Sequence, residues 1–560
     1  MKKTFKFMLA TAAACALVLS CEKPEVPQDD PKDPTQEQPE TPGEEEEEPA
    51  PEPTLEVSLT ELAFEAAAGE ATFTVTTNQD WAAATEAAWI TLDPASGAVS
   101  TEAATVKVTA AENTVTEART ATVTVTAGEL TKTITVTQAA AIPQPDGTEA
   151  NPYLVSDAAT LKGMSDLLVA NATTYFKLTA NIDLTSAEWT PISTIETVDE
   201  TTVVKAIALD GCNYTISNAK DALFSTLCGS VQNLTVDGAA INASNTVGVI
   251  ANQVKDATIK TVEVKNSSIV STAGEAGGAV GKVSNGTLEN VKVACSVSGT
   301  QQLGVLVGRF EDGKIKNCTV TGKITGTLYY IGGLAGLMTG GSVEGCSADV
   351  NATTASTTYG RIGCFIGQVE GGSISTSHAA GSVTSDGHYG GGFIGVLAKD
   401  NEVNVSKCYA TGSVNLPSGV NKSGGAGFIG AIENNGTFVI SDCYTTANVT
   451  AYRWSGSFIG RALNNSKVTV TNCYSKANCT FTQPANCGML CGDASTSVPI
   501  TANGFIGWNL NELTLFVRST METAPEGSYF GKDGTISAKA KGFNWNESIW
   551  DLSKDDPTLK

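Results

Sequence analysis

Apolar and polar residues alternate with a period of two through residues 55–139. The clearest stretches are ATFTVTTN, TVKVTA, TATVTVTA and TKTITVTQ, which are separated by Gly, Asn or Asp. An alternation of β-branched and polar residues is typical of strands that turn one face to a core. It predicts a small antiparallel, immunoglobulin-like β-sandwich at residues 55–140.

A second pattern runs from residue 223 to 492, where short apolar runs ending in Gly recur every 27 to 35 residues. The runs end at Gly281, Gly308, Gly336, Gly367, Gly395, Gly430, Gly460 and Gly492. Repeats of this length, made of short strands, predict a solenoid whose coils stack about 4.8 Å apart. We expect the glycines at corners, where either a positive φ or the close approach of neighbouring coils excludes a side chain.

Each repeat also carries a stretch such as NCTVTG or NCYSKA, and these stretches superpose without gaps on one column. The column consists of Leu234, Val262, Val291, Cys318, Cys346, Ser377, Cys408, Cys443 and Cys473. Since apolar residues and Cys interchange there, we expect buried thiols that point inward, with disulfides as the alternative. A disulfide is more readily expected among Cys479, Cys487 and Cys491, where the repeat loosens, and zinc is not expected because His is absent nearby.

Both ends of the solenoid carry segments outside the repeat. After a linker at residues 141–147, residues 148–222 supply the N-terminal cap and first strands, and residues 493–560 supply the C-terminal cap. The stretch AATLKGMSDLLV at 158–169 predicts a helix that covers the open lower edge. A GFIG at 504–507 falls off the period and is assigned to the C-terminal cap.

The chain begins with a basic region and an apolar run at residues 7–19 that is too short to span a bilayer, which predicts a signal peptide at 1–20. The run ends in VLSC, which resembles a bacterial lipobox, and this resemblance implies lipidation of Cys21; an ordinary cleaved signal peptide is the alternative. Residues 22–54 contain 13 acids and nine prolines and predict a disordered tether from residue 21 onward. Its acidity near Cys21 also resembles the surface-export signals of Bacteroidetes lipoproteins.

Two families resemble the rest of the chain. The segments LEVSLTELAFEAAAGEATFTVTTN, DWAAATEAAWITLDPASG and RTATVTVTAGELTKTITVTQ resemble the BACON domain, a Bacteroidetes module associated with carbohydrate-active proteins. The repeats GGGFIG and GAGFIG, with their lead-in and ending, resemble the GLUG motif of bacterial surface and adhesin-type proteins. That resemblance covers about residues 147–560 and implies a right-handed parallel β-helix. The whole chain is then all-β.

Candidate binding residues follow partly from these resemblances. The BACON likeness makes Trp81 and Trp89 candidates for stacking on sugar rings, with core packing as the alternative for both. Six residues before each corner glycine, one column reads Glu275, Gln302, Tyr330, Arg361, Tyr389, Gly424 and Trp454. If it faces outward, Tyr330, Arg361, Tyr389 and Trp454 form an aromatic and arginine stripe suited to a glycan. Alternatively, these side chains shield the corner, and Tyr409, Tyr444 and Tyr474 form a stacked scaffold.

Other chemistries have less support. GGGFIG at 390–395 matches a dinucleotide-binding fingerprint but lacks the strand–turn–helix context and recurs once per coil, so no nucleotide is expected. The net charge of −24 disfavours nucleic acid. The acids Asp312, Glu344, Glu370, Asp400, Glu433 and Asp442 do not recur as a close pair at one column, and His378 and His388 are the chain's two histidines.

We therefore expect a surface-exposed, outer-membrane lipid-anchored adhesin or carbohydrate-binding protein that is not an enzyme. Its expected partners are glycans or host surface glycoproteins, with no cofactor or metal. A polysaccharide lyase or glycoside hydrolase of the β-helix class and a purely structural spacer are the alternatives.

Overall fold

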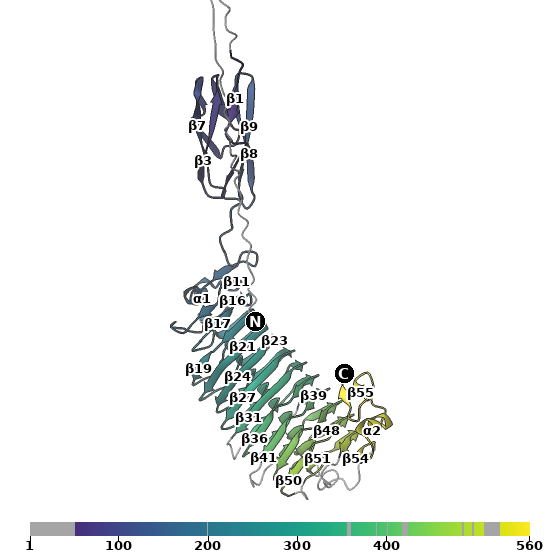
Figure 1. Cartoon of the computed structure of the whole chain (residues 1–560). Helices are drawn as coiled ribbons and strands as arrows, with labels where there is room; N and C mark the ends of the chain where they lie inside the picture. The colour runs from purple at the N-terminus through teal and green to yellow at the C-terminus, as the bar shows by residue number, and fades with distance from the viewer. Residues whose placement is uncertain are drawn as a thin grey trace, which may run out of the picture. The chain divides into compact units, whose positions relative to one another are not determined.

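The computed structural model describes residues 51–560 except 199, 355–359, 388, 400, 417–423, 484–486, 496–497 and 509–526. Cys21, most of the acidic segment, His388 and Asp400 lie outside the described residues. The chain divides into two compact units (Figure 1). The first ends at Ile142, and the second starts at Pro143. Among the described helices, none has the length and apolar character needed to cross a bilayer.

The first unit is a β-sandwich, as its alternating pattern predicted. A four-stranded sheet in the order β1-β3-β7-β5 packs against a five-stranded sheet in the order β2-β9-β8-β4-β6. The strands are β1 (Leu55–Val57), β2 (Glu61–Phe64), β3 (Gly69–Thr77), β4 (Trp81–Ala84), β5 (Ile90–Asp93), β6 (Ser96–Gly97), β7 (Ser100–Ala110), β8 (Arg119–Ala127) and β9 (Leu130–Gln138). Alternate residues such as Phe73, Val106, Val123 and Ile134 fill the core between the sheets.

The second unit is a β-solenoid, in which strands of successive coils pair in parallel and in register (Figure 1). In its first coils the strands are β10 (Tyr153–Val155), β11 (Thr173–Leu178), β12 (Ile182–Asp183), β13 (Ile192–Ser193), β16 (Ala206–Asp210), β17 (Thr215–Ser217), β18 (Phe224–Asp237) and β19 (Ala240–Ala243). Between β13 and β16, β14 (Ile195–Val198) and β15 (Thr201–Val204) pair as an antiparallel hairpin in a sheet of their own. The coils share one continuous core of apolar residues.

Two strands flank each glycine corner. Before the corner, a seven-stranded sheet contains β20 (Val247–Gly248), β22 (Ala276–Gly277), β25 (Gln302–Gly304), β28 (Tyr330–Gly332), β32 (Arg361–Gly363), β37 (Tyr389–Gly391) and β42 (Gly424–Ala426). After it come β21 (Ala251–Ser271), β23 (Val280–Glu289), β26 (Val307–Lys316), β29 (Ala335–Met338), β33 (Ile366–Val369), β38 (Ile394–Leu397), β43 (Ile429–Ile432), β47 (Ile459–Ala462) and β51 (Cys491–Ala494).

The remaining strands complete the coils on either side of the Cys column. Before it lie β30 (Ser342–Glu344), β34 (Gly372–Ser375), β39 (Glu402–Ser406), β44 (Thr437–Ser441), β48 (Lys467–Thr471) and β52 (Ile500–Asn503). After it lie β24 (Lys292–Gly299), β27 (Thr319–Gly326), β31 (Ser347–Thr354), β35 (His378–Ala379), β36 (Ser382–Ser385), β40 (Tyr409–Ala410), β41 (Ser413–Leu416), β45 (Tyr444–Thr445), β46 (Asn448–Ala451), β49 (Tyr474–Ser475), β50 (Cys479–Phe481) and β53 (Ile506–Trp508).

The corner positions must be glycine because neighbouring coils approach each other closely there, and not because the backbone has a positive φ. A Cβ on Gly395 would lie 2.4 Å from the carbonyl oxygen of Gly367, and one on Gly460 would lie 2.2 Å from that of Gly430. Neither glycine has a positive φ. Of the two causes that the sequence left open, the backbone of the preceding coil is therefore the one that excludes a side chain.

Positive φ occurs instead at the residue just before the Cys column. There the chain turns through the left-handed region with φ values of 50–70° in coil after coil. The residues are Asn233, Thr261, Asn290, Asn317, Gly345, Thr376, Lys407, Asp442, Asn472 and Gly504. Asn and Gly predominate because they adopt this conformation at the lowest cost.

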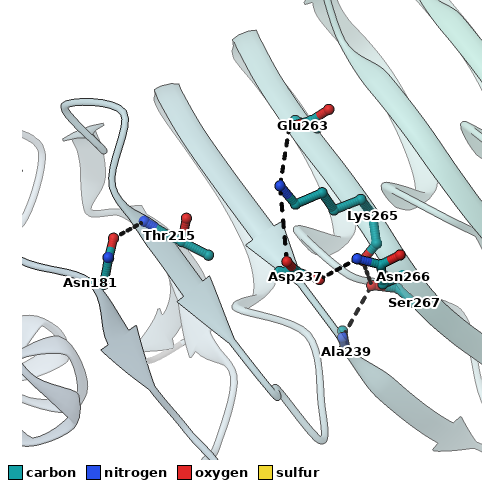
Figure 2. Close-up of polar contacts among 8 residues, drawn as sticks. All are labelled: Asn181, Thr215, Asp237, Ala239, Glu263, Lys265, Asn266 and Ser267. Atoms are coloured by element: carbon teal, nitrogen blue, oxygen red, sulfur yellow. Dashed lines mark hydrogen bonds and ion pairs between the residues drawn. The ribbon is translucent and has the colours of Figure 1, made fainter. Parts of the chain in front are cut away.

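Asparagine also links coils at the next corner (Figure 2). Asn266, with φ of 50°, donates its side-chain amide to Asp237 on the preceding coil at 2.9 Å, while the ammonium of Lys265 lies between Asp237 and Glu263. Ser267 accepts a hydrogen bond from the backbone N–H of Ala239 at 3.1 Å. These side-chain bonds connect adjacent rungs where the backbone ladder is interrupted.

The Cys column points inward and is buried. Cys318, Cys346, Cys408, Cys443 and Cys473 are each at most 1% exposed, and all of them are free thiols. Cys487 and Cys491 are also buried free thiols, and Cys479 is buried beside them in the same loosened part of the repeat. A second inward column stacks Phe365, Phe393, Phe428 and Phe458 with ring centroids 4.5–5.0 Å apart.

The first edge of the solenoid is covered by a helical turn in the predicted segment. Helix α1 (Ala158–Gly163) starts at a capping box between Asp157 and Thr160 and continues as a 3₁₀ turn, η1 (Met164–Leu167). Leu161 and Met164 are buried against the core. Because the helical part stops at residue 167, it is shorter than the sequence pattern indicated.

The final coil explains the GFIG that fell off the period. Gly504 occupies the positive-φ position, with φ of 70°, and Ile506 pairs with Tyr474, so GFIG here lies at the Cys column rather than at a glycine corner. The solenoid thus extends past residue 492, where the sequence pattern placed the start of the cap. Beyond this coil lie β54 (Tyr529–Gly531), α2 (Ile536–Gly542), β55 (Trp550–Asp551) and β56 (Thr558–Leu559).

Candidate functional site

The aromatic and arginine stripe exists as a register-matched column on the seven-stranded sheet. Gln302 pairs with Tyr330, Tyr330 with Arg361, Arg361 with Tyr389, and Tyr389 with Gly424. The next residue of each strand, such as Ile331, is buried in the core. Because side chains alternate across a strand, the stripe residues project to the other face of this sheet.

A second column, which was not predicted from the sequence, faces the stripe across the glycine corner. It consists of the residue directly after each corner glycine: Lys282, Arg309, Leu337, Gln368, Val396, Ala431, Arg461 and Asp493. Glutamate recurs two residues after Arg309, Gln368 and Ala431, as Glu311, Glu370 and Glu433. We call this set of residues the facing column. The recurrence of Glu three places after Gly308, Gly367 and Gly430 was the available signal.

Arg361 connects the two columns. Its guanidinium donates to Gln368 and forms an ion pair with Glu433 at 2.9 Å, and it lies 5.6 Å from the ring centroid of Tyr330. The Arg361 side chain is 28% exposed, so one side of it remains open to solvent. One phenol and one planar guanidinium, those of Tyr330 and Arg361, therefore lie side by side at a partly accessible surface, an arrangement that suits contact with ring-shaped polar ligands.

The network continues through two carboxylates that the sequence showed as scattered. Gln368 donates to Glu370 at 2.6 Å, and Glu370 also pairs with Lys399. Glu370 and Glu433 thus lie at the two ends of a Gln368–Arg361 bridge. Both carboxylates are engaged by donors within the protein.

Tyr389 is the least accessible member of the stripe. It is 7% exposed and packs with Val396, Ala398 and Ala431. Burial, followed by the negative charge of Glu433, raises the pKa of Tyr389 to about 12. The Tyr389 ring is therefore packed beneath the surface, and little of it is accessible to a ligand.

Trp454 ends the stripe at the C-terminal side. Its φ of 51° is unusual for an aromatic residue. The guanidinium of Arg453 lies 3.9 Å from its ring centroid and that of Arg461 lies 4.6 Å from it. Arg461 also pairs with Asp493 at 3.0 Å. Trp454 is partly exposed, so part of its ring is accessible beside two cations.

In the sandwich, the two tryptophans differ in burial. Trp81 is 5% exposed and packs in the core, where a Cβ on Gly97 would come within 2.5 Å of its indole nitrogen. Trp89 is partly exposed at the edge of the core, with the guanidinium of Arg119 at 4.5 Å from its ring centroid. Of the two roles left open for Trp81, the structure favours packing; Trp89 keeps an accessible part of its ring.

The tyrosine ladder is a covered scaffold over most of its length. His378, Tyr409, Tyr444 and Tyr474 stack with centroid distances of 4.7–4.8 Å. Trp550 packs against Tyr444 and Tyr474, which are both buried. The described residues contain no group of His, Cys, Asp or Glu arranged to hold a metal ion.

Family models match a segment in each of the two parts of the chain. A family model described as the viral BACON domain matches residues 54–141, and the GLUG motif matches residues 299–325 and 327–353. The second GLUG match contains Tyr330. No curated protein matches the chain.

Solved structures show only distant similarity. A Bacteroides ovatus GH5 xyloglucanase in complex with a XXXG heptasaccharide is 18% identical over 30% of this chain and 37% of its own, with a TM-score of 0.15. A candidate immunoglobulin A1 protease from Bacteroides ovatus is 16% identical over 74% and 94%, with a TM-score of 0.24. An IgA1 protease is 15% identical over 68% and 26%, with a TM-score of 0.34.

The chain spans well under half the length of the xyloglucanase and of the last protease. With TM-scores below 0.5, none of these structures supports an inference about activity. The family models carry the identification: this chain contains a BACON domain at residues 54–141, followed by a β-solenoid that contains GLUG motifs at residues 299–353.

Proposed function

We propose that this protein is a non-catalytic, cell-surface glycan-binding protein or adhesin, and that its stripe contacts an extended glycan. The observation that carries the proposal is the partly exposed pair of Tyr330 and Arg361 on adjacent coils, in which the buried amide of Gln368 holds the Arg361 guanidinium. Aromatic faces suit the C–H side of a sugar ring, and guanidinium groups suit its hydroxyls. A BACON domain in the same chain supports the same reading.

The decisive experiment measures binding of the secreted chain to an array of host and dietary glycans. By secreted chain we mean residues 22–560, which lack the signal segment and Cys21. Tyr330→Ala removes the accessible ring without deleting a charge, and we expect it to weaken binding about tenfold. Lys316→Ala is the matched control, because Lys316 is exposed on another face of the solenoid. If Tyr330→Ala binds as well as the parent, the stripe is not the site; if the parent binds no glycan, a spacer role replaces the proposal.

The non-catalytic part of the proposal is tested separately. Glu370 and Glu433 are the two carboxylates of the network around Arg361, and both are engaged by donors of the protein. We expect no release of reducing or unsaturated sugar ends from any polysaccharide that the array identifies. Release that disappears in Glu370→Gln or Glu433→Gln would establish an enzyme instead.

The proposal includes a lipid anchor at Cys21, supported by the VLSC stretch and the acidic, Pro-rich segment that follows it. The chain supplies its own control, since Cys15 lies within the apolar run of the signal segment. Cys21→Ser should abolish fatty-acid labelling and release the protein from membranes, whereas Cys15→Ser should change neither. Surface exposure is read from protease sensitivity in intact cells.

A further inference from the structure

A separate cleft of about 490 Å³ lies in the first coils of the solenoid. Its floor is the outward face of β11, β16 and β18, and its wall is the loop at residues 149–152. These coils precede the stripe, which starts at Tyr330. The volume lies within the range of small-molecule sites in proteins.

Short side chains create the hollow. Tyr175, Ala208 and Ser230 pair in register across the three strands, so a large side chain is followed by two small ones. The wall is held in place because the backbone N–H of Tyr175 donates to the carbonyl of Gly147 at 2.9 Å. The cleft thus forms where the short side chains of Ala208 and Ser230 lie beside a fixed loop.

The neighbouring outward column places polar groups along one side of the floor. Lys177, Asp210 and Gln232 pair in register on the same three strands. The carboxylate of Asp210 accepts hydrogen bonds from Gln232 and Asn233, each at 3.1 Å, and from the backbone N–H of Cys212 at 2.9 Å. A carboxylate held by three donors is oriented before any ligand arrives.

The protonation state of Asp210 agrees with a role as an acceptor. Burial raises its pKa, but the hydrogen bonds from Cys212, Asn233 and Gln232 outweigh burial and bring the pKa below its ordinary value. Asp210 is therefore ionised at neutral pH. Glu149 adds a second carboxylate in the wall, and Lys177 is the one lysine or arginine among the residues that line the cleft.

We propose that this cleft binds a neutral sugar residue, with its C–H face against Tyr175 and its hydroxyls shared between Asp210 and Lys177. An aromatic ring beside a fixed carboxylate and an ammonium group offers both acceptors and donors to adjacent hydroxyls. Two carboxylates against one ammonium group disfavour a phosphate or an acidic sugar. This site is distinct from the stripe and does not depend on it.

Saturation-transfer difference NMR of the secreted chain with galactose, mannose, glucose, fucose and N-acetylglucosamine tests the site, with sialic acid and inorganic phosphate as anionic probes. Ala208→Leu fills the floor, and Asp210→Asn keeps the shape but removes the charge. Each should weaken binding at least tenfold, as measured by titration. Glu289→Gln is the control, since Glu289 lies in the same outward column two strands beyond Gln232.

Ala208 faces outward, so Ala208→Leu should leave the melting temperature unchanged. If Ala208→Leu nevertheless disturbs folding, Asp210→Asn still tests the site. The proposal is overturned if no neutral sugar binds, if binding survives both variants, or if the anionic probes bind more tightly. Tyr330→Ala separates this site from the stripe. Sugar binding lost only in Tyr330→Ala would overturn the cleft and leave the proposed function intact.

Discussion

Arg361 forms an ion pair with Glu433 at 2.9 Å, although the two residues lie 72 positions apart and on coils that are separated by the coil of Tyr389. The Glu433 side chain is 14% exposed and that of Arg361 is 28% exposed. This contact therefore ties three coils together on the face that carries the proposed glycan site. It depends on register, since each coil must stack with its corner glycine directly above the last.

We expect Arg361→Ala to lower the free energy of unfolding by about 1–2 kcal/mol, because it leaves Gln368 and Glu433 without their common partner. Solvent access to the pair keeps the loss below that of a fully buried ion pair. The measurement is a double-mutant cycle with Glu433→Gln by urea denaturation. Strictly additive effects of the two substitutions would show that the pair is not coupled.

Gly460→Ala should destabilise the solenoid by about 3 kcal/mol or more, because its Cβ would lie 2.2 Å from the Gly430 carbonyl oxygen. Gly163→Ala in α1 is the control, since no atom outside its own helix backbone and chain neighbours lies within 4 Å of the added carbon. There we expect no loss, and up to about 1 kcal/mol of gain from helix propensity. The measurement compares the melting temperatures of the two variants. Equal melting temperatures would refute the close-approach explanation.

The positive-φ column predicts opposite effects for a reciprocal exchange. Thr376 and Asn317 occupy equivalent corners with φ of 51° and 52°, and both are exposed. A β-branched residue is strained in this region, whereas Asn tolerates it. Thr376→Asn should therefore stabilise the protein by about 1 kcal/mol and Asn317→Thr should destabilise it by a similar amount. Changes of the same sign in chemical denaturation would contradict this account.

Alkaline pH should destabilise the solenoid through its buried thiols. Burial raises the pKa of Cys364 to about 12 from an ordinary value of 9.0. Because the folded-state pKa is the higher one, stability is fully present below about pH 9 and falls as the pH rises toward 12. Unfolding free energies between pH 7 and 10.5, measured with a reductant present, should decline less steeply in Cys364→Ala. An identical slope would show that this thiol does not contribute.

The two tryptophans of the BACON domain should differ in their effect on stability. Trp81→Ala empties a buried site and should cost about 3–5 kcal/mol, whereas Trp89→Ala removes a partly exposed ring and should cost about 1–2 kcal/mol. Hydrogen exchange of residues 54–141 within the whole chain measures both losses. Equal loss of protection would mean that Trp89 is as much a part of the core as Trp81.

Local pattern was enough to predict the architecture. A period of two identifies strands with one buried face, and a 27–35-residue repeat of strands and glycines has few solutions other than stacked coils. The inward Cys column and the in-register stripe followed from the same periodicity. Such features depend on residues near one another in sequence, or on exact repetition, and both are visible in a single chain.

The tertiary structure alone decided which side chains meet. Gln368, Glu370 and Glu433 join Arg361 because the chain bends at each glycine corner, and the angle of that bend is not encoded in any spacing. Burial of Tyr389 and Trp81, and the hollow beside Ala208, likewise depend on what neighbouring coils, sheets and loops place around them. Periodicity assigns a residue to a face; only packing across strands distant in sequence determines whether that face is open and what it contacts.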